Sequence, residues 1–164
     1  MRKSMRLGIG AALALAIGTG AQVGAEKGGH GTDKDHVMVR PDDVKWGPPP
    51  PALPAGAMTA VLTGDPSKAV PYVMRVKLPD GYRVPPHWHP SDENVTVIKG
   101  TFMMGKGDKF NADAAESLPA GSFVRMPKEM RHFAWAKGET IIQLHGIGPF
   151  TINYVNAADD PRQK

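Results

Sequence analysis

The chain contains no cysteine among its 164 residues. Its fold must therefore be held by a hydrophobic core alone, and it is insensitive to the redox state of its compartment. No segment shows the sustained helical periodicity of apolar side chains that an amphipathic helix requires. Beyond the N-terminal segment, no apolar run reaches the roughly 20 residues that a membrane span needs. These absences argue against a disulfide scaffold, a helix bundle and a helical membrane protein.

The chain also lacks a surplus of positive charge when residues 1–25 are left out of the count. The whole chain carries +4, from 20 basic and 16 acidic residues. Three of the basic residues, Arg2, Lys3 and Arg6, precede Ala25, where no acidic residue occurs, so 17 basic residues remain against 16 acidic ones. The basic isoelectric point belongs largely to the N-terminus, and it does not indicate a nucleic-acid partner.

Residues 1–25 have the layout of a secretory signal peptide. A positively charged start is followed by the apolar run Leu7 to Ile17, and small residues around Ala25 offer a cleavage point. The pattern predicts a periplasmic or secreted protein with no membrane attachment after cleavage. The alternative is an uncleaved N-terminus that anchors the chain to a membrane.

Residues 26–56 are expected to form a flexible, proline-rich arm. The part from Glu26 to Lys34 is rich in glycine and charge, which is typical of mobile chain. The run Pro48 to Pro51 is extended and lacks backbone donors, so it should lie across a surface as a strap.

From Ala57 onward the sequence indicates short β-strands. Residues 72–78 alternate well, with Tyr72, Met74, Val76 and Leu78 on one face. Proline-then-glycine turns close the segments that end at Gly81 and Gly121. Strands at this spacing argue for an antiparallel sandwich or barrel. We expect a domain over 57–157 and a charged tail over 158–164 that frays.

Two histidines and a carboxylate lie close together after one of these turns. His87 and His89 are two residues apart, so in an extended strand their imidazoles point to the same side. Glu93 shares their parity. Two imidazoles and a carboxylate on one face provide three of the ligands that a divalent metal needs.

The spacing of these residues carries a resemblance. The pattern G-x5-H-x-H-x3-E-x6-G is matched in full by Gly81, His87, His89, Glu93 and Gly100. A second pattern, G-x5-P-x-G-x2-H-x3-N, is matched in part by Gly121, Pro127 and His132, whereas Glu129 and Ala136 replace its later glycine and its asparagine. On these residues the chain resembles the cupin superfamily, and in particular the small exported single-domain cupins of bacteria.

The resemblance implies an all-β fold, a small antiparallel jelly-roll β-barrel, here with an extended N-terminal arm. It also implies a metal held by four residues: His87, His89, Glu93 and His132. Such a set leaves one or two coordination positions open for water or substrate. Imidazole and carboxylate suit Fe(II), Mn, Zn, Ni or Cu, so the ligands alone do not choose the metal.

Other side chains extend the predicted site. His145 is a candidate catalytic base if it faces the cavity, and otherwise a residue at the barrel rim. Tyr154 is expected in the core rather than in the pocket. Four methionines near the motifs would favour Cu(I) if they were ligands, but they are better explained as core residues: Met103, Met104, Met126 and Met130. We expect a mostly apolar lining that includes Val95, Val97, Phe102 and Met104.

Three functions are compatible with such a site. The first is a metal-dependent enzyme of oxygenase, isomerase or lyase type that acts on a small organic molecule. The second is a binding or sensing module in which the metal anchors a small ligand without turnover. The third is a structural barrel stiffened by the metal. A homodimer is compatible with each of them.

Overall fold

The structure is a computed structural model that describes residues 36–164. The predicted signal peptide and the first part of the predicted arm lie outside the described residues. No helix in the described part is long and apolar enough to cross a membrane. The described chain is built from antiparallel strands and short 3-10 turns. The strands are β1 (Met58–Gly64), β2 (Pro71–Leu78), β3 (Arg83–Trp88), β4 (Glu93–Lys106), β5 (Glu116–Pro119), β6 (Phe123–Met126), β7 (His132–Ile147) and β8 (Asn153–Tyr154).

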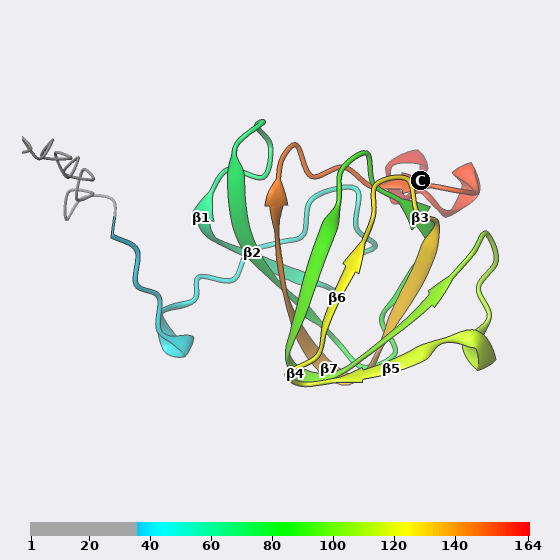
Figure 1. Cartoon of the computed structure of the whole chain (residues 1–164), viewed down its shortest axis with the longest axis horizontal. Helices are drawn as coiled ribbons and strands as arrows, with labels where there is room; N and C mark the ends of the chain where they lie inside the picture. The colour runs from blue at the N-terminus through cyan, green and yellow to red at the C-terminus, as the bar shows by residue number, and fades with distance from the viewer. Residues whose placement is uncertain (1–35) are drawn as a thin grey trace, which may run out of the picture. The chain divides into compact units, whose positions relative to one another are not determined.

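The long strand β7 organises the sheet. Its second half pairs with β2, its first half pairs with β3, and β4 pairs with it along almost its whole length. Strand β1 extends the sheet beyond β2, β8 extends it beyond β3, and β5 and β6 both pair with β4. The strands run around a common interior, as a jelly roll does (Figure 1). The all-β, antiparallel jelly-roll fold is therefore confirmed, but the ladder does not close into a complete ring, because β1 and β8 end its path.

The core follows from alternation along the strands. On β2 the predicted inner face is confirmed, since Tyr72, Met74, Val76 and Leu78 are all buried while the residues between them are half-buried. Side chains from β3, β4 and β7 meet this face and form one hydrophobic cluster. The cluster lies directly beneath the histidine-bearing ends of β3 and β7.

Gly100 allows β4 and β7 to change direction together. Its φ is +77°, and a Cβ there would lie 2.4 Å from the backbone oxygen of Glu139 and 2.7 Å from the hydroxyl of Thr140. Thr140 is fully buried and its hydroxyl donates to the Thr101 carbonyl at 3.0 Å. The glycine that ends the first motif is thus required by backbone conformation and by close approach.

Gly100→Ala is expected to lower the free energy of unfolding by about 3 kcal/mol, because the left-handed conformation and the contact with β7 both penalise a side chain. Gly81→Ala is the matched control. Gly81 has φ +71° but open space around the missing Cβ, so only about 1 kcal/mol should be lost. Urea unfolding measures both, and equal losses would mean that the contact with β7 contributes nothing.

The proline run lies across the sheet as the predicted strap. Gly47 exchanges two backbone hydrogen bonds with Thr59 of β1, at 2.8 and 2.9 Å. The hydroxyls of Tyr154 and Tyr82 donate to the carbonyls of Ala52 and Pro54. Between these anchors Leu53 is buried in the core. The part of the arm that the structure describes is therefore attached to the barrel from residue 47 onward.

The C-terminal tail is ordered, contrary to the expectation that it frays. It forms two short 3-10 turns, η4 (Ala157–Asp159) and η5 (Pro161–Gln163). Arg162 pairs with the buried Asp160 and donates from Nη2 to the Ile152 carbonyl at 3.0 Å. These contacts hold the tail against the chain segment that leads into β8.

Candidate metal centre

The four predicted ligands come from the ends of three strands. His87 lies at the end of β3 and is the direct partner of His132, the first residue of β7. His89 follows β3, and Glu93 begins β4. His87 and His89 share a face of the extended chain, and the intervening Trp88 is only half-buried. All four side chains are buried.

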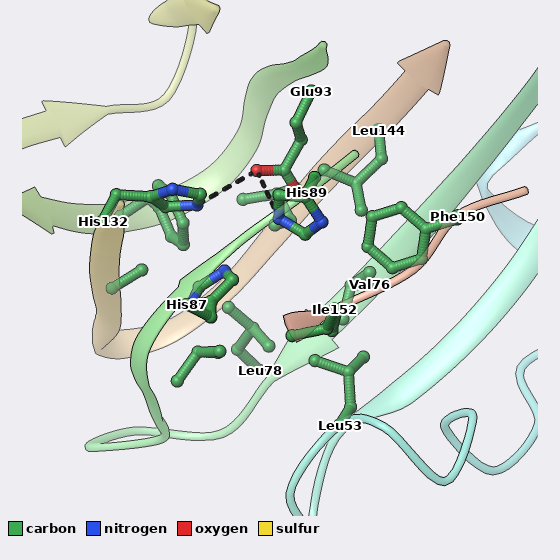
Figure 2. Close-up of a pocket in the computed structure, with 14 residues that line it drawn as sticks. Leu53, Val76, Leu78, His87, His89, Glu93, His132, Leu144, Phe150 and Ile152 are labelled. Carbon is green, nitrogen blue, oxygen red and sulfur yellow. Dashed lines mark ion pairs between the residues drawn. The ribbon is translucent and has the colours of Figure 1, made fainter. Parts of the chain in front are cut away.

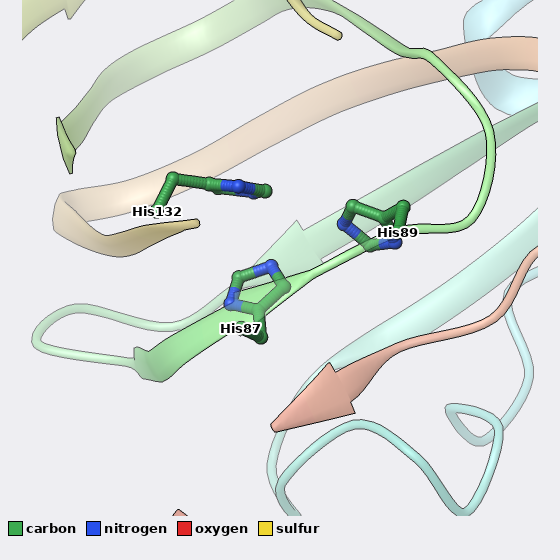
Figure 3. A group of neighbouring side chains, drawn as sticks. All are labelled: His87, His89 and His132. Carbon is green, nitrogen blue, oxygen red and sulfur yellow. The ribbon is translucent and has the colours of Figure 1, made fainter. Parts of the chain in front are cut away.

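The three histidines form one cluster, and the Glu93 carboxylate lies beside two of them. The Nε2 atoms of His89 and His132 lie 3.3 and 3.4 Å from the same carboxylate oxygen of Glu93, Oε2 (Figure 2). The ring of His87 faces both other imidazoles (Figure 3), with ring centroids 4.2 Å from His132 and 5.1 Å from His89. One nitrogen from each histidine lies within 4.8 Å of the other two. The structure therefore brings together all four residues that the sequence predicted.

Backbone carbonyls fix the orientation of each imidazole. The Nδ1 of His87 lies 2.7 Å from the Pro85 oxygen, that of His89 lies 2.7 Å from the Thr151 oxygen, and that of His132 lies 2.9 Å from the Met130 oxygen. Because a carbonyl oxygen only accepts, each Nδ1 must carry the proton. Each Nε2 is then the atom with a free lone pair, as in histidines that ligate metals.

The charges of the site fit a cation. The Nε2 of His89 is buried and makes no aligned hydrogen bond, although the Glu93 carboxylate is beside it. A neutral imidazole nitrogen and a carboxylate are both acceptors, so they repel unless a proton or a metal ion lies between them. The three imidazoles and the carboxylate therefore suit a divalent transition metal.

The pKa values of His87, His89 and Glu93 show how the charges of the metal-free site are distributed. Burial, reinforced by the two neighbouring imidazoles, lowers the pKa of His87 to about 3. Burial alone would lower the pKa of His89, but the Glu93 carboxylate outweighs it and raises that pKa overall. Burial would likewise raise the pKa of Glu93, yet His89 and His132 hold it well below its usual range. The carboxylate is ionised and His87 is neutral, as metal binding requires.

The four donors line an apolar cavity of about 40 Å³. The prediction of an apolar lining is confirmed, but of its four candidates only Phe102 lines this space. Val95, Val97 and Met104 are buried elsewhere in the core, and no methionine of the described chain reaches the cavity. The lining side chains besides the four donors are Leu53, Val76, Leu78, Val84, Phe102, Ala134, Ile142, Leu144, Phe150 and Ile152.

The structure does not bring His145 to the cavity. Its side chain is exposed and stacks on Phe123, with ring centroids 6.3 Å apart. Leu144, its neighbour on β7, lines the cavity instead. By the two-residue period of a strand, Gln143 and His145 share one face of β7, and the structure shows that this is the outer face. Tyr154 also stays out of the cavity and packs beside the core, as expected.

Two residues that shape the site were missed by the sequence analysis. Leu53 enters the cavity from the strap, and Phe150 stacks on His89 with centroids 5.2 Å apart and planes 25° apart. Neither belongs to a motif. The proline run was a signal that a strap covers something, but nothing in the sequence indicated what lies beneath it.

Glu129 replaces the glycine of the second motif without displacing His132. Its φ is +64°, the left-handed conformation that glycine would adopt. Its backbone N–H donates to the His89 carbonyl at 2.8 Å. The turn before β7 is therefore tied directly to the strand end that carries the other histidines.

Arg162 is expected to help to fix the orientation of the His89 ring, although it does not contact that ring. It holds the Ile152 carbonyl, next to the Thr151 carbonyl that orients His89. Arg162→Ala should weaken metal binding about tenfold, in the range expected for partners behind a ligand. Titration with a competing chelator measures this, and nitrogen NMR of the His89 ring reports the loss of its single tautomer. Lys99→Ala, which removes an exposed ion pair with Glu139, should change neither, and an unaltered Arg162→Ala variant would contradict the role.

Comparisons with known proteins agree with the fold. The profile of the family described as the ChrR cupin-like domain matches residues 34–151. No curated protein matches the sequence. Among solved structures, the polyketide cyclase RemF from Streptomyces resistomycificus is 18% identical, with a TM-score of 0.60 over 77% of this chain and 89% of that one.

Two further solved structures share the fold. A candidate acetylacetone dioxygenase from Methylibium petroleiphilum PM1 is 19% identical, with a TM-score of 0.58 over 80% of this chain and 89% of that one. An RmlC-like cupin protein from Ralstonia eutropha JMP134 is 21% identical, with a TM-score of 0.53 over 68% of each chain. With its jelly-roll fold, its histidine cluster and a family match over most of its length, this chain belongs to the ChrR cupin-like domain family of the cupin superfamily.

Proposed function

We propose that this protein is a metal-dependent enzyme that acts on a small, uncharged organic molecule, with oxygenase chemistry favoured. The observation that carries the proposal is a cluster of three buried histidines, with the buried Glu93 carboxylate beside two of them, at an apolar cavity. A metal held there has protein ligands on one side and apolar space on the other, so positions for substrate remain open. When bound, such a metal would polarise an oxygen-bearing substrate or activate oxygen beside it.

The chain's own residues favour oxygenase chemistry over isomerase or lyase chemistry. Proton transfers in isomerases and lyases are usually made by a positioned acid or base. Within the described residues, the cavity has no titratable side chain besides the four donors. The apolar walls exclude water, and the three carbonyl-bound imidazoles keep the donors in place.

The experiment combines metal analysis with turnover. The protein is stripped with a chelator, reloaded in turn with Fe(II), Mn, Ni, Cu or Zn, and tested for oxygen uptake with a panel of uncharged diols, thiols and phenols. Uptake that needs both a substrate and Fe(II) or Mn supports the proposal, provided that it disappears in His132→Ala and persists in His145→Ala. Tight metal binding with saturable ligand binding but no turnover with any metal would overturn it.

Metal binding and ligand binding without turnover would identify a binding or sensing module. The same feature supports this alternative, because a cavity without a free acid or base can hold a metal-anchored ligand without transforming it. A metal that survives chelation and binds no ligand would instead indicate a purely structural role.

We further propose that the protein is exported, which rests on the pattern of residues 1–25. Mass spectrometry of the N-terminus after expression in a bacterial host provides the test. A mature chain that begins near Glu26 in the periplasmic or secreted fraction supports export, and an intact Met1 in the cytoplasmic fraction contradicts it.

A further inference from the structure

The cavity at the metal centre is too small for the substrate that the proposed function requires. Its volume of about 40 Å³ leaves room for roughly three water molecules, since one water needs about 10 to 15 Å³ of such space. The metal and the oxygen atoms bound to it would fill most of this space. An organic molecule with more than a few heavy atoms must therefore extend beyond this space.

A larger groove lies beside the cavity, under the proline strap. Its volume is about 350 Å³. No charged side chain of the part of the chain that the structure describes lines it, and the Thr59 hydroxyl is already bonded to the Pro48 carbonyl. The walls are therefore suited to an uncharged apolar group. The lining residues are Pro48, Pro49, Pro50, Thr59, Val61, Pro66, Ser67, Met74 and Phe150.

Among residues 36–164, Phe150 alone lines both spaces. Figure 2 shows its ring beside that of His89, on which it stacks, and its edge meets Tyr72 at a centroid distance of 6.1 Å. The backbone N–H of Phe150 is bonded to the Pro66 carbonyl at 2.7 Å. Because the main chain is held there, rotation of the side chain is the simplest motion that joins the groove to the cavity.

The strap borders the same passage from the other side. Its prolines line the groove, while Leu53 lines the cavity. The Leu53 N–H donates to the Pro50 carbonyl at 2.9 Å, so one tight turn carries the chain from one space to the other. The strap and Phe150 therefore both connect the lining of the groove with the lining of the cavity.

We propose that the groove holds the apolar tail of the substrate and that the Phe150 ring is the gate between tail and metal. The inference rests on the proposed metal site and names its substrate class. The substrate carries an oxygen-bearing head that binds the metal, joined to an uncharged hydrocarbon or aromatic tail. Each methylene that leaves water for the groove strengthens binding about fourfold.

The test uses protein loaded with Co(II), whose visible spectrum reports ligands at the metal. Acetohydroxamic acid and octanohydroxamic acid present the same head to the metal and differ by six methylenes in the tail. We expect the longer acid to bind at least about 30-fold more tightly, allowing for the displacement of Phe150. In Phe150→Ala the longer acid should associate at least about tenfold faster, because no ring has to move.

Matched tryptophan variants locate the tail. Val61 is exposed and lines the groove, so Val61→Trp fills the groove from outside and should remove most of the preference for the longer acid. Ile98→Trp adds the same bulk at an exposed site away from the groove and should leave the preference unchanged. A preference that survives Val61→Trp overturns the assignment of the groove.

The outcomes separate this inference from the function on which it rests. If Co(II) does not bind, or binds but takes up neither acid, the proposed metal site with open positions is wrong. If Co(II) and acetohydroxamic acid bind but the longer acid binds no more tightly, the metal site stands and the groove proposal is wrong. An association rate that is unchanged in Phe150→Ala contradicts the gate alone.

Discussion

His132→Ala is expected to weaken the binding of a divalent metal about 100-fold. A site of four protein ligands binds zinc with about 10 to 16 kcal/mol, so one ligand contributes about 3 kcal/mol, which corresponds to about two orders of magnitude. His132 is nearly fully buried, and its Nε2 lies 3.4 Å from Glu93. Its removal takes away one donor and leaves the carboxylate with one fewer partner. Competition with a fluorescent chelator measures the affinity.

His145→Ala is the matched control for this prediction, because it removes an imidazole from the same strand on the outer face. Its metal affinity should equal that of the wild type. The melting temperature of both variants is recorded without metal, so that unfolding is not mistaken for loss of a ligand. A folded His132→Ala variant with wild-type affinity would show that this residue is not a ligand.

The metal-free protein is expected to lose about 1.4 kcal/mol of unfolding free energy per pH unit between about pH 6.5 and pH 4.5. The cause is His87. Its pKa is lowered to about 3 by burial and by the neighbouring imidazoles, whereas in the unfolded chain it titrates normally. As the pH falls below about 6.5, the unfolded state takes up a proton that the folded state refuses, so stability is lost.

The other two groups of the site with shifted pKa values, His89 and Glu93, do not obscure this slope. The raised pKa of His89 contributes stability that is fully present below its ordinary pKa and is lost only as the pH rises. The lowered pKa of Glu93 contributes stability that is lost only at lower pH, below its ordinary pKa. Between about pH 6.5 and pH 4.5, the slope that these three groups produce therefore reports His87.

Urea unfolding in the presence of a chelator, at several pH values, measures the slope. In His87→Asn the slope should fall by about one proton, because the amide does not titrate. His145→Asn should keep the wild-type slope. Retention of the full slope in His87→Asn would show that another group is responsible for the loss of stability in acid.

Much of the metal centre follows from local sequence. His87, His89 and Glu93 lie within one short segment, where the two-residue period of a strand places the histidines on the same side. His132 was reached only through the resemblance, and its motif was incomplete. The structure explains why His132 reaches the site although the motif lacks its later glycine. Glu129 adopts the left-handed conformation that this glycine would have provided.

Only the tertiary structure decided what surrounds these donors. The alternation on β7 showed that Gln143 and His145 share a face, but a period of two cannot say which face is inside. The carbonyl that orients His89 belongs to Thr151, 62 residues further along the chain. Leu53 and Phe150 both line the cavity although they are far apart in the sequence. Such contacts depend on how distant segments pack, and no local spacing records that. The sequence by itself determined most of the strands and the candidate ligands His87, His89 and Glu93, because these depend on neighbours along the chain. The lining of the cavity, the position of Phe150 and what the proline strap covers were decided by packing between segments that are far apart in sequence.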